Sequence, residues 1–356
     1  MKGKIMSKFF STKHSKLIPY TPGEQPKDMK YIKLNTNESP YPPSEKAIAE
    51  ASNQAELLRL YPDPECTSLR EDIAAYYGVE KENVVLSNGS DEILNFAFIA
   101  YGDEAHPFVF PDITYGFYNV FAAVNNIPYE EIPLEEDFTI DFKKYCGINK
   151  NIVIANPNAP TGIFAPLTEI EKVAQSNPDN IVIVDEAYVD FGGETAIPLT
   201  KKYDNIIVVQ TFSKSRSMAG ARLGFCIASK EICRDLNTIR YSVNPYNINR
   251  MTMAAGSAAI NDREYFERNR LEIIETREKT REALIDMGFE VLSSKTNFLF
   301  VKSDKIGGEE LYRKLRENGI LVRHFTSERI AEYNRITIGT PEDMETFINT
   351  VKGLIL

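Results

Sequence analysis

The chain has 356 residues, of which 43% are hydrophobic and 26% are charged, a composition typical of a globular protein large enough for two domains. Its formal net charge of −10 argues against a general binding surface for nucleic acids or anionic membranes, although a few arginines can still build a local anion site. Because no stretch approaches the ~18 apolar residues of a membrane span and the first residues lack a secretory pattern, we expect a cytoplasmic protein without nucleic-acid or membrane partners.

The first segment, residues 1–43, is rich in proline, as in "PYTPGEQP" and "NESPYPP". Such a composition favours extended chain and turns over helices. We therefore expect an extended N-terminal arm that joins the smaller of two domains.

Residues 44–245 repeat one pattern, in which a short apolar run ends in polar, Gly or Pro residues and a helical pattern often follows. Continuous apolar runs predict strands buried on both faces, as in a parallel sheet covered by helices. We expect such strands at 84–86, 108–110, 152–155, 181–184 and 206–209. The unusual polar residues follow these strands, and in such sheets ligands bind beyond the carboxyl ends of the strands. The pattern predicts a large ligand-binding domain with a mostly parallel sheet.

Residues 246–356 have a different character. Long, highly charged helical patterns come first, and short strands are expected at 298–301 and within "ILVRHF" and "RITIGT". This part of the chain is predicted to form a smaller α/β domain, so the predicted fold class is α/β throughout.

Two cations, Lys214 and Arg222, follow the strand predicted at 206–209. A lysine at the end of a buried strand can be partly desolvated, which lowers its pKa and frees a neutral amine as a nucleophile. A guanidinium suits bidentate phosphate binding, and Thr211 and Ser213 add hydroxyl donors. The alternative is a surface lysine in a loop, but a reactive lysine beside a phosphate site indicates pyridoxal phosphate, an aldehyde cofactor with a phosphate handle.

Other strand ends offer what this cofactor requires. Asp185 can keep the ring nitrogen protonated, and Tyr188 can donate to the phenolic oxygen of the ring. The helix start expected at Ser90 and Asp91 can give backbone N–H groups to the phosphate, and Tyr115 can cover the ring face. Each residue also has an ordinary interpretation, such as a helix cap, a turn or a half-buried core tyrosine.

The motifs resemble those of a known family in their order along the chain. They are "PYTPGEQP", "LNTNESPYPPS", "LYPDP", "SNGSDE", "TYGFY", "NPNAPTG", "VDEAYVDF", "TFSKSRSMAGARLGF", "GILVRHF" and "RITIGTPEDM". The chain resembles fold-type I pyridoxal-phosphate aminotransferases and, within them, the histidinol-phosphate aminotransferase family, nearly end to end. The resemblance implies transamination between L-histidinol phosphate and 2-oxoglutarate in histidine biosynthesis, which gives imidazole-acetol phosphate and glutamate.

The resemblance also implies a role for each site residue. Lys214 binds the cofactor covalently and moves a proton between the substrate α-carbon and the cofactor's C4′. The implied cofactor contacts are Asp185 at the ring nitrogen, Tyr188 at the phenolic oxygen, Tyr115 on the ring face, and Ser90, Asp91, Thr211, Ser213 and Arg222 at the phosphate.

Four more residues lie on the substrate side by the same resemblance. Arg335 matches the carboxylate-binding arginine and Arg323 a second anion clamp, while Tyr20 and Asn37 close over the ligand from the arm. Tyr61 in "LYPDP" resembles a tyrosine that crosses a dimer interface to the phosphate, which implies a homodimer with shared active sites.

One position departs from the family pattern. Most relatives carry an asparagine before the proline of Asn-Pro-Thr-Gly, and it bonds the phenolic oxygen, but here Ala159 precedes Pro160. Asn158 is the nearest candidate for this cofactor contact, although it stands one residue early and points elsewhere if the segment is extended.

Several alternatives stay open at this stage. A threonine-phosphate decarboxylase and an aromatic amino-acid aminotransferase would share the same scaffold. A non-enzymatic pyridoxal-phosphate sensor would need an attached DNA-binding domain, for which the pattern leaves no room, and a Rossmann dehydrogenase would need a GxGxxG motif that is missing. The histidines and cysteines show no metal-ligand spacing, so we expect free thiols and no protein-bound metal.

Overall fold

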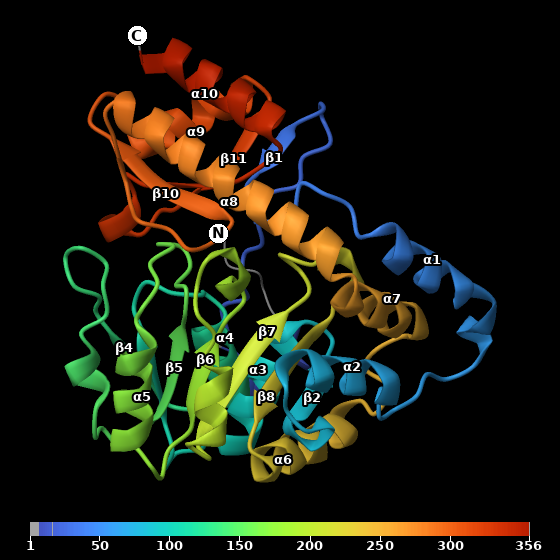
Figure 1. The fold of residues 1–356 in the computed structure, drawn as a ribbon. Coiled ribbons are helices and arrows are strands. Elements are labelled where there is room, and N and C mark those ends of the chain that lie inside the picture. The colour runs from blue at the N-terminus through green and yellow to red at the C-terminus, as the bar shows by residue number, and fades with distance from the viewer. Residues whose placement is uncertain (1–6, 16, 356) are drawn as a thin grey trace.

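The chain folds into a larger and a smaller lobe that are joined by a long helix (Figure 1). The structure is a computed structural model that describes residues 7–15 and 17–355. Residues 1–6 and 16, which belong to the predicted arm, and residue 356 lie outside the described residues.

The larger lobe contains a seven-stranded sheet with the order β2-β8-β7-β6-β5-β3-β4. The strands are β2 (Val84–Ser87), β3 (Phe108–Pro111), β4 (Tyr129–Ile132), β5 (Asn151–Ala155), β6 (Val182–Asp185), β7 (Ile206–Thr211) and β8 (Gly224–Ala228). Strands β3 to β7 pair in parallel, and β8 runs antiparallel between β2 and β7. Every residue of these strands is buried except in the edge strand β4, which explains the continuous apolar runs of the sequence.

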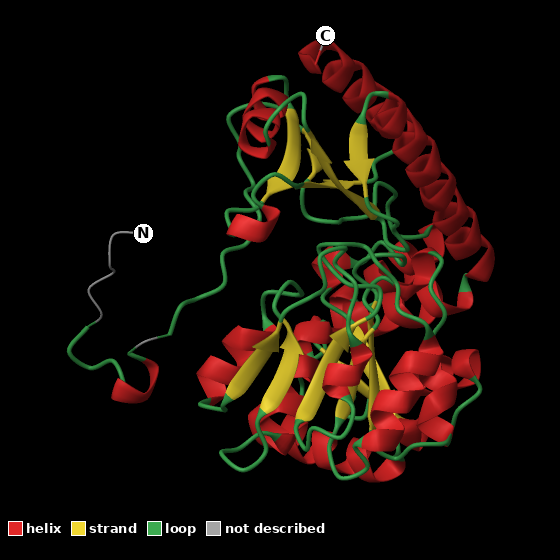
Figure 2. Ribbon diagram, turned by 90° about the vertical axis from the view of Figure 1, so that its left-hand side faces the viewer, coloured by secondary structure: helices red, strands yellow, loops and turns green. Residues whose placement is uncertain are grey.

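Helices cover both faces of this sheet (Figure 2). One face packs against α2 (Thr67–Tyr77), α5 (Leu167–Ser176) and α7 (Arg250–Asn261). The other face packs against α3 (Ser90–Tyr101), α4 (Tyr118–Asn125) and α6 (Lys230–Val243), while α1 (Glu45–Asn53) lies on α7. The strands are thus enclosed between two apolar layers of helices. Polar side chains of this sheet can therefore meet a ligand at the strand ends.

The smaller lobe contains a five-stranded sheet with the order β1-β11-β12-β10-β9. Its strands are β1 (Ile32–Leu34), β9 (Phe289–Val291), β10 (Phe298–Ser303), β11 (Ile320–His324) and β12 (Asn334–Thr337). Its apolar core is shared with α8 (Arg263–Asp286), α9 (Gly308–Glu317) and α10 (Pro341–Ile355). Because β1 pairs in parallel with β11, the N-terminal arm contributes a strand to this sheet.

The structure confirms the predicted α/β class, with a mostly parallel main sheet and a second, smaller α/β unit. The boundary predicted at residue 246 stays a prediction. Since α7 buries Ala255, Ala259 and Ile260 in the core of the larger lobe, we propose that the division lies within α8 instead.

Two general features concern the chain outside the site. None of the described helices is long and apolar enough to cross a membrane. All four cysteines have free thiols, and Cys146 is the exposed one among them.

Candidate active site

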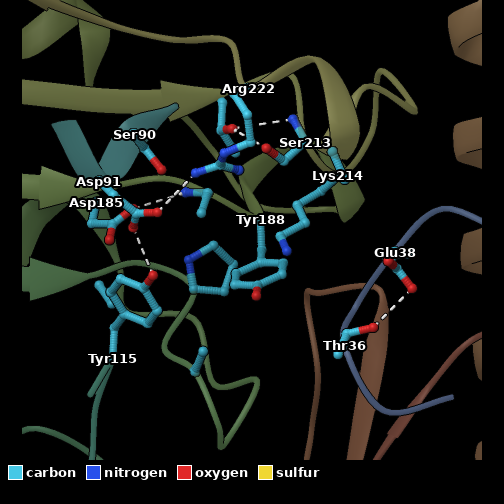
Figure 3. Close-up of a pocket in the computed structure, with 16 residues that line it drawn as sticks. Thr36, Glu38, Ser90, Asp91, Tyr115, Asp185, Tyr188, Ser213, Lys214 and Arg222 are labelled. Carbon is cyan, nitrogen blue, oxygen red and sulfur yellow. Dashed lines mark hydrogen bonds and ion pairs between the residues drawn. The ribbon is translucent and has the colours of Figure 1, made fainter. Parts of the chain in front are cut away.

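A cavity of about 230 Å³ opens where the parallel strands of the larger sheet end. Ala155, Asp185 and Thr211 close β5, β6 and β7, and all three line it. Figure 3 shows the side chains that converge here from these strands, from the start of α3 and from the N-terminal arm. The other residues that line the cavity are Thr36, Glu38, Ser90, Asp91, Tyr115, Pro157, Ala159, Ala187, Tyr188, Ser213, Lys214, Ala219 and Arg222.

Lys214 reaches into the cavity from the turn that follows β7. Its Nζ lies 5.7 Å from the centre of the Tyr188 ring, and in Figure 3 the side chain extends toward that ring. The amine is therefore placed between the two lobes, where a ligand held by either one can meet it.

One end of the cavity can bind an anion. Helix α3 begins at Ser90, so its first backbone N–H groups are free to bind a ligand. Arg222, Ser213 and Thr211 face the same place, with Ser213 Oγ accepting a hydrogen bond from Thr211 Oγ1 at 2.9 Å. Gly89 has a φ of +78°, and a Cβ there would lie 2.6 Å from Arg222 Nη2, so glycine is what allows this approach.

The carboxylate of Asp91 has a role that the sequence did not indicate. Its Oδ1 accepts a hydrogen bond from Tyr115 at 2.6 Å, and its Oδ2 pairs with Arg222 Nη2 at 3.0 Å. The side chain thereby connects the candidate ring-covering tyrosine to the candidate phosphate arginine. Its backbone N–H, at the start of α3, is the group that remains available for an anion.

Asp185 provides a buried acid in the wall of the same cavity. Its Oδ2 accepts a hydrogen bond from the Tyr118 hydroxyl at 2.7 Å, and its Oδ1 accepts one from the Ala187 backbone at 3.2 Å. Burial raises the pKa of Asp185 to about 6. A cationic ligand group beside this carboxylate would favour its ionised form, and a protonated ring nitrogen is such a group.

A second cavity of about 370 Å³ adjoins the first and shares Lys214, Tyr115 and Tyr188 with it. The predicted substrate residues all line it: Tyr20, Asn37, Arg323 and Arg335. The structure thus brings the substrate-side candidates from the arm and the smaller lobe to the lysine of the larger lobe.

Arg335 gives this second cavity its cationic character. Its guanidinium lies over the rings of Phe298 and Phe325, at 5.3 and 5.9 Å from the ring centres. Its Nη2 donates to the Asn35 carbonyl oxygen at 3.1 Å, but its buried Nε has no hydrogen-bond partner among residues 7–15 and 17–355. Burial lowers the pKa of Arg335, and Arg323 nearby lowers it further. A buried cation with an unused donor can bind an anionic ligand group, so Arg335 stays a candidate for that role.

The N-terminal arm closes one side of this second cavity. Asn37 donates from Nδ2 to the Tyr188 hydroxyl at 2.8 Å and accepts from Thr337 Oγ1 at 2.9 Å, so it connects Tyr188 to β12. Tyr20 packs against Phe117 with 4.3 Å between ring centres and a 30° tilt between the rings. The arm is therefore part of the cavity wall.

Two predicted cofactor residues do not line either cavity. The Asn158 amide donates to Thr161 and to the Ile113 carbonyl oxygen and accepts from Thr114. Both ends of this amide are hydrogen-bonded away from the two cavities. This agrees with the expectation that successive side chains of an extended segment point to opposite sides, so the geometry does not support a cofactor contact. Tyr61 is 77% exposed and stacks on Tyr246, away from Lys214 of its own chain.

Sequence reasoning missed several residues that the structure brings to the site. Tyr118 holds Asp185, and its position in "TYGFY" on the first turn of α4 was a usable signal. Thr36 and Glu38 line the first cavity from the arm, where Thr36 Oγ1 donates to Glu38 Oε2 at 2.8 Å. Nothing in the proline-rich sequence of the arm indicated which of its polar residues face inward.

Comparisons with known proteins show which family the chain belongs to. A family model described as "Aminotransferase class I and II" matches residues 29–351. The histidinol-phosphate aminotransferase of Brachyspira hyodysenteriae is 50% identical over 354 residues, which are 98% of this chain and 99% of that protein. The chain belongs to the histidinol-phosphate aminotransferase family. A second relative, the histidinol-phosphate aminotransferase of Clostridium acetobutylicum, is 46% identical over 351 residues, which are 98% of this chain and 100% of that protein.

Solved structures match the fold of this aminotransferase as well. The histidinol-phosphate aminotransferase of Sinorhizobium meliloti, solved in complex with pyridoxal-5'-phosphate, superposes with a TM-score of 0.83. It is 24% identical and covers 91% of this chain and 92% of its own.

The residues of this aminotransferase fit the same cofactor. Arg222, Ser213 and the start of α3 line one end of the cavity as a candidate phosphate cradle, and Gly89 leaves room for the Arg222 side chain there. The buried Asp185 in the same cavity would offer a counter-charge to a cationic ring nitrogen. An amine, a phosphate cradle and a buried acid in one cavity match the three functional ends of pyridoxal phosphate.

Proposed function

We propose that the protein is a pyridoxal-phosphate-dependent transaminase that transfers the amino group of L-histidinol phosphate to 2-oxoglutarate in histidine biosynthesis. The observation that carries this proposal is the pair of arginines, Arg323 and Arg335, that line one cavity with Lys214. Histidinol phosphate brings a phosphate and no carboxylate, whereas glutamate brings two carboxylates and no phosphate. Because a guanidinium binds either anion, the same pair can serve both ligands in turn.

The larger lobe would hold the cofactor. Arg222, Ser213, Thr211 and the N–H groups at Ser90 and Asp91 bind the phosphate, and Tyr115, held by the Asp91 carboxylate, covers the ring. When bound, pyridoxal phosphate supplies an aldehyde that takes up the substrate's amino group and a ring that disperses the electron pair left at the α-carbon.

Three side chains of the enzyme would control protons. Asp185, which accepts a hydrogen bond from the Tyr118 hydroxyl, would keep a proton on the ring nitrogen. Tyr188, which accepts a hydrogen bond from Asn37, is free to donate its own proton to the phenolic oxygen. Lys214 would hold the cofactor through its Nζ and, with that amine free, would move a proton between the substrate α-carbon and the cofactor's C4′.

A homodimer belongs to the same proposal. Exposed apolar side chains gather on α1, the segment after it and the end of α6: Ile48, Leu58, Leu60, Tyr61 and Val243. Such a patch is typical of a surface that another subunit covers. In the dimer the partner subunit's Tyr61 would reach the phosphate cradle. A cytoplasmic location stays a prediction from the sequence.

Product analysis tests the proposed reaction. The purified protein, loaded with cofactor, is incubated with histidinol phosphate, threonine phosphate or phenylalanine, each together with 2-oxoglutarate. We expect a yellow protein and fast glutamate formation with histidinol phosphate. Release of CO₂ from threonine phosphate would indicate the decarboxylase, and faster transfer from phenylalanine would indicate an aromatic aminotransferase.

An arginine variant tests the shared anion site. Arg335→Leu removes one charge-assisted contact, so the KM values for both histidinol phosphate and glutamate should rise roughly ten- to a hundredfold. If only the KM for glutamate rose, the two ligands would not share Arg335, and Arg323 would be the phosphate ligand.

A further inference from the structure

Arg329, on the 3₁₀ turn Glu328–Ile330 of the smaller lobe, bonds to three groups of the larger lobe. Its Nη1 pairs with Asp112 Oδ2 at 3.0 Å. Its Nη2 donates to the carbonyl oxygens of Leu134 at 3.0 Å and Glu135 at 2.9 Å. The guanidinium also lies over the Phe138 ring, 5.6 Å from its centre. One side chain thus ties two separate segments of the larger lobe to the smaller one.

An apolar cluster next to Arg329 also joins the two lobes. It comprises Ile113, Leu134 and Phe138 of the larger lobe and Phe300, Ile330 and Tyr333 of the smaller lobe. Phe138 meets Tyr333 edge-on with 5.4 Å between ring centres. Because all six side chains are at least nine-tenths buried, the lobes are packed together here rather than merely close.

The position of Arg329 in the chain connects this contact to the substrate cavity. The turn lies in the connection between β11, which carries Arg323, and β12, which carries Arg335. Its neighbours Phe325 and Ser327 line that cavity, as does Asp112, the residue directly after β3. Asp112 also begins the segment that leads to Tyr115. The contact therefore joins the segment with both anion-binding arginines to the segment with the ring-covering tyrosine.

We propose that Arg329 is a positioning residue, which fixes Arg323 and Arg335 of the smaller lobe at the correct distance from Lys214 of the larger lobe. This inference rests on the proposed function for its kinetic test. An exposed ion pair contributes little by itself, and Arg329 and Asp112 are 38% and 24% exposed. The three hydrogen bonds together require a planar, branched donor, so lysine can replace the charge but not the geometry.

Kinetics with the cofactor-loaded enzyme provide the first test. Arg329→Ala should raise the KM for both histidinol phosphate and 2-oxoglutarate by roughly threefold to tenfold, with little change in kcat, because substrate and transition state lose the same anion contacts. Arg329→Lys and Asp112→Asn should give smaller increases in the same direction. The cofactor dissociation constant should stay unchanged, since the cofactor contacts lie within the larger lobe.

A matched control separates positioning from a general loss of charge. Arg313 lies on α9, is exposed, and pairs with Glu317 at 2.6 Å within the same helix. Arg313→Ala should leave both KM values unchanged. If Arg329→Ala lowered kcat, cofactor affinity and thermal stability together, or if both KM values matched the wild type, the positioning role would be refuted.

Hydrogen–deuterium exchange provides a test that does not depend on turnover, with inorganic phosphate as the probe anion. Phosphate should slow exchange in residues 320–337 of the wild type, and Arg329→Ala should speed exchange there and weaken that protection. A wild type that fails to convert histidinol phosphate would refute the proposed function alone. Unchanged exchange in Arg329→Ala and Arg329→Lys would refute the positioning role alone.

Discussion

Lys214 stands where the buried strand β7 ends, and its amine lines both cavities. Lys214→Ala should abolish turnover, by more than the ~10²–10⁴-fold that general acid–base catalysis contributes, because covalent attachment and proton transfer are both lost. The variant should still bind the cofactor non-covalently through Arg222 and the start of α3. Turnover and cofactor binding by equilibrium dialysis check this, and near-normal turnover in the variant would contradict it.

A substitution at Gly89 tests the proposed phosphate cradle. Gly89→Ala places a methyl group 2.6 Å from Arg222 Nη2 at a φ of +78°, so the arginine must move. We expect the cofactor dissociation constant to rise roughly tenfold or more, the scale of one charge-assisted hydrogen bond. Gly78→Ala is the control, since φ there is +63° and nothing lies within 4 Å of the new Cβ. An equal effect of the two variants on cofactor affinity would rule out the cradle.

Among single residues, the sequence predicted those whose functional groups pyridoxal phosphate requires. Asp185 ends the buried strand β6, Lys214 and Arg222 follow the buried strand β7, and parallel strands bring such positions together at one edge. The side-chain partners were not predictable. Whether the Asp91 carboxylate faces an anion or a tyrosine depends on the φ/ψ angles of the helix start and on where Tyr115 lies, which spacing alone does not specify.

A buried carboxyl group at the end of β6 is expected to make the stability of the larger lobe depend on pH. Glu186 follows Asp185 and is fully enclosed, where it accepts hydrogen bonds from Thr195, the Ala196 backbone and Gln210. Burial raises the pKa of Glu186 to about 7 from 4.5. Between these two values the folded state holds more protons than the unfolded state, so stability must fall as the pH rises.

The pH dependence of unfolding tests this. Stability should fall by roughly 3 kcal/mol as the pH rises from about 4.5 to above 7, if Glu186 alone is counted. Glu186→Gln should flatten that slope, although its amide meets a hydrogen-bond donor and lowers stability by a constant amount. Glu231→Gln, at the exposed start of α6, is the control. Melting temperatures of the cofactor-free proteins at several pH values decide it, and an unchanged slope in Glu186→Gln would count against the buried acid.

The elements themselves were predictable where their burial was uniform. The predicted strands at 84–86, 152–155 and 206–209 correspond to β2, β5 and β7, because a strand buried on both faces has no polar positions. The edge strand β4 has the sequence "YEEI" and is largely exposed, so it lacked that signal. Strand β8 was missed because it follows a loop in which the lysine and arginine dominate the pattern.

At the scale of the whole molecule, α8 and the arm connect lobes that each contribute to one site. The arm adds β1 to the smaller sheet and then places Asn37 on Tyr188, so the substrate cavity depends on three parts of the chain. No local sequence pattern specifies how two lobes face each other. The contacts of Arg329 could therefore be found only in the structure, although Arg323 and Arg335, the candidate anion-binding arginines, were singled out from the sequence.

The exposed apolar patch leads to a prediction about assembly. Tyr61 stacks on Tyr246 with 4.6 Å between ring centres, and Arg250 donates to the Tyr61 carbonyl oxygen at 2.8 Å, so the loop is ordered although its ring is exposed. Such an ordered, exposed aromatic side chain is suited to enter a partner's site. Each cradle would then receive the partner subunit's Tyr61 and be incomplete in a monomer.

Charged substitutions in the patch test this dependence. Leu58 and Leu60 are 56% and 45% exposed, so replacing both with glutamate should leave the fold of one chain intact while preventing association. We expect a monomer by sedimentation, with cofactor affinity reduced at least as much as in Tyr61→Phe. Ile285→Glu, at the far end of α8 and 41% exposed, is the control and should stay dimeric. A monomer that keeps full cofactor affinity and full activity at high dilution would show that each chain completes its own site.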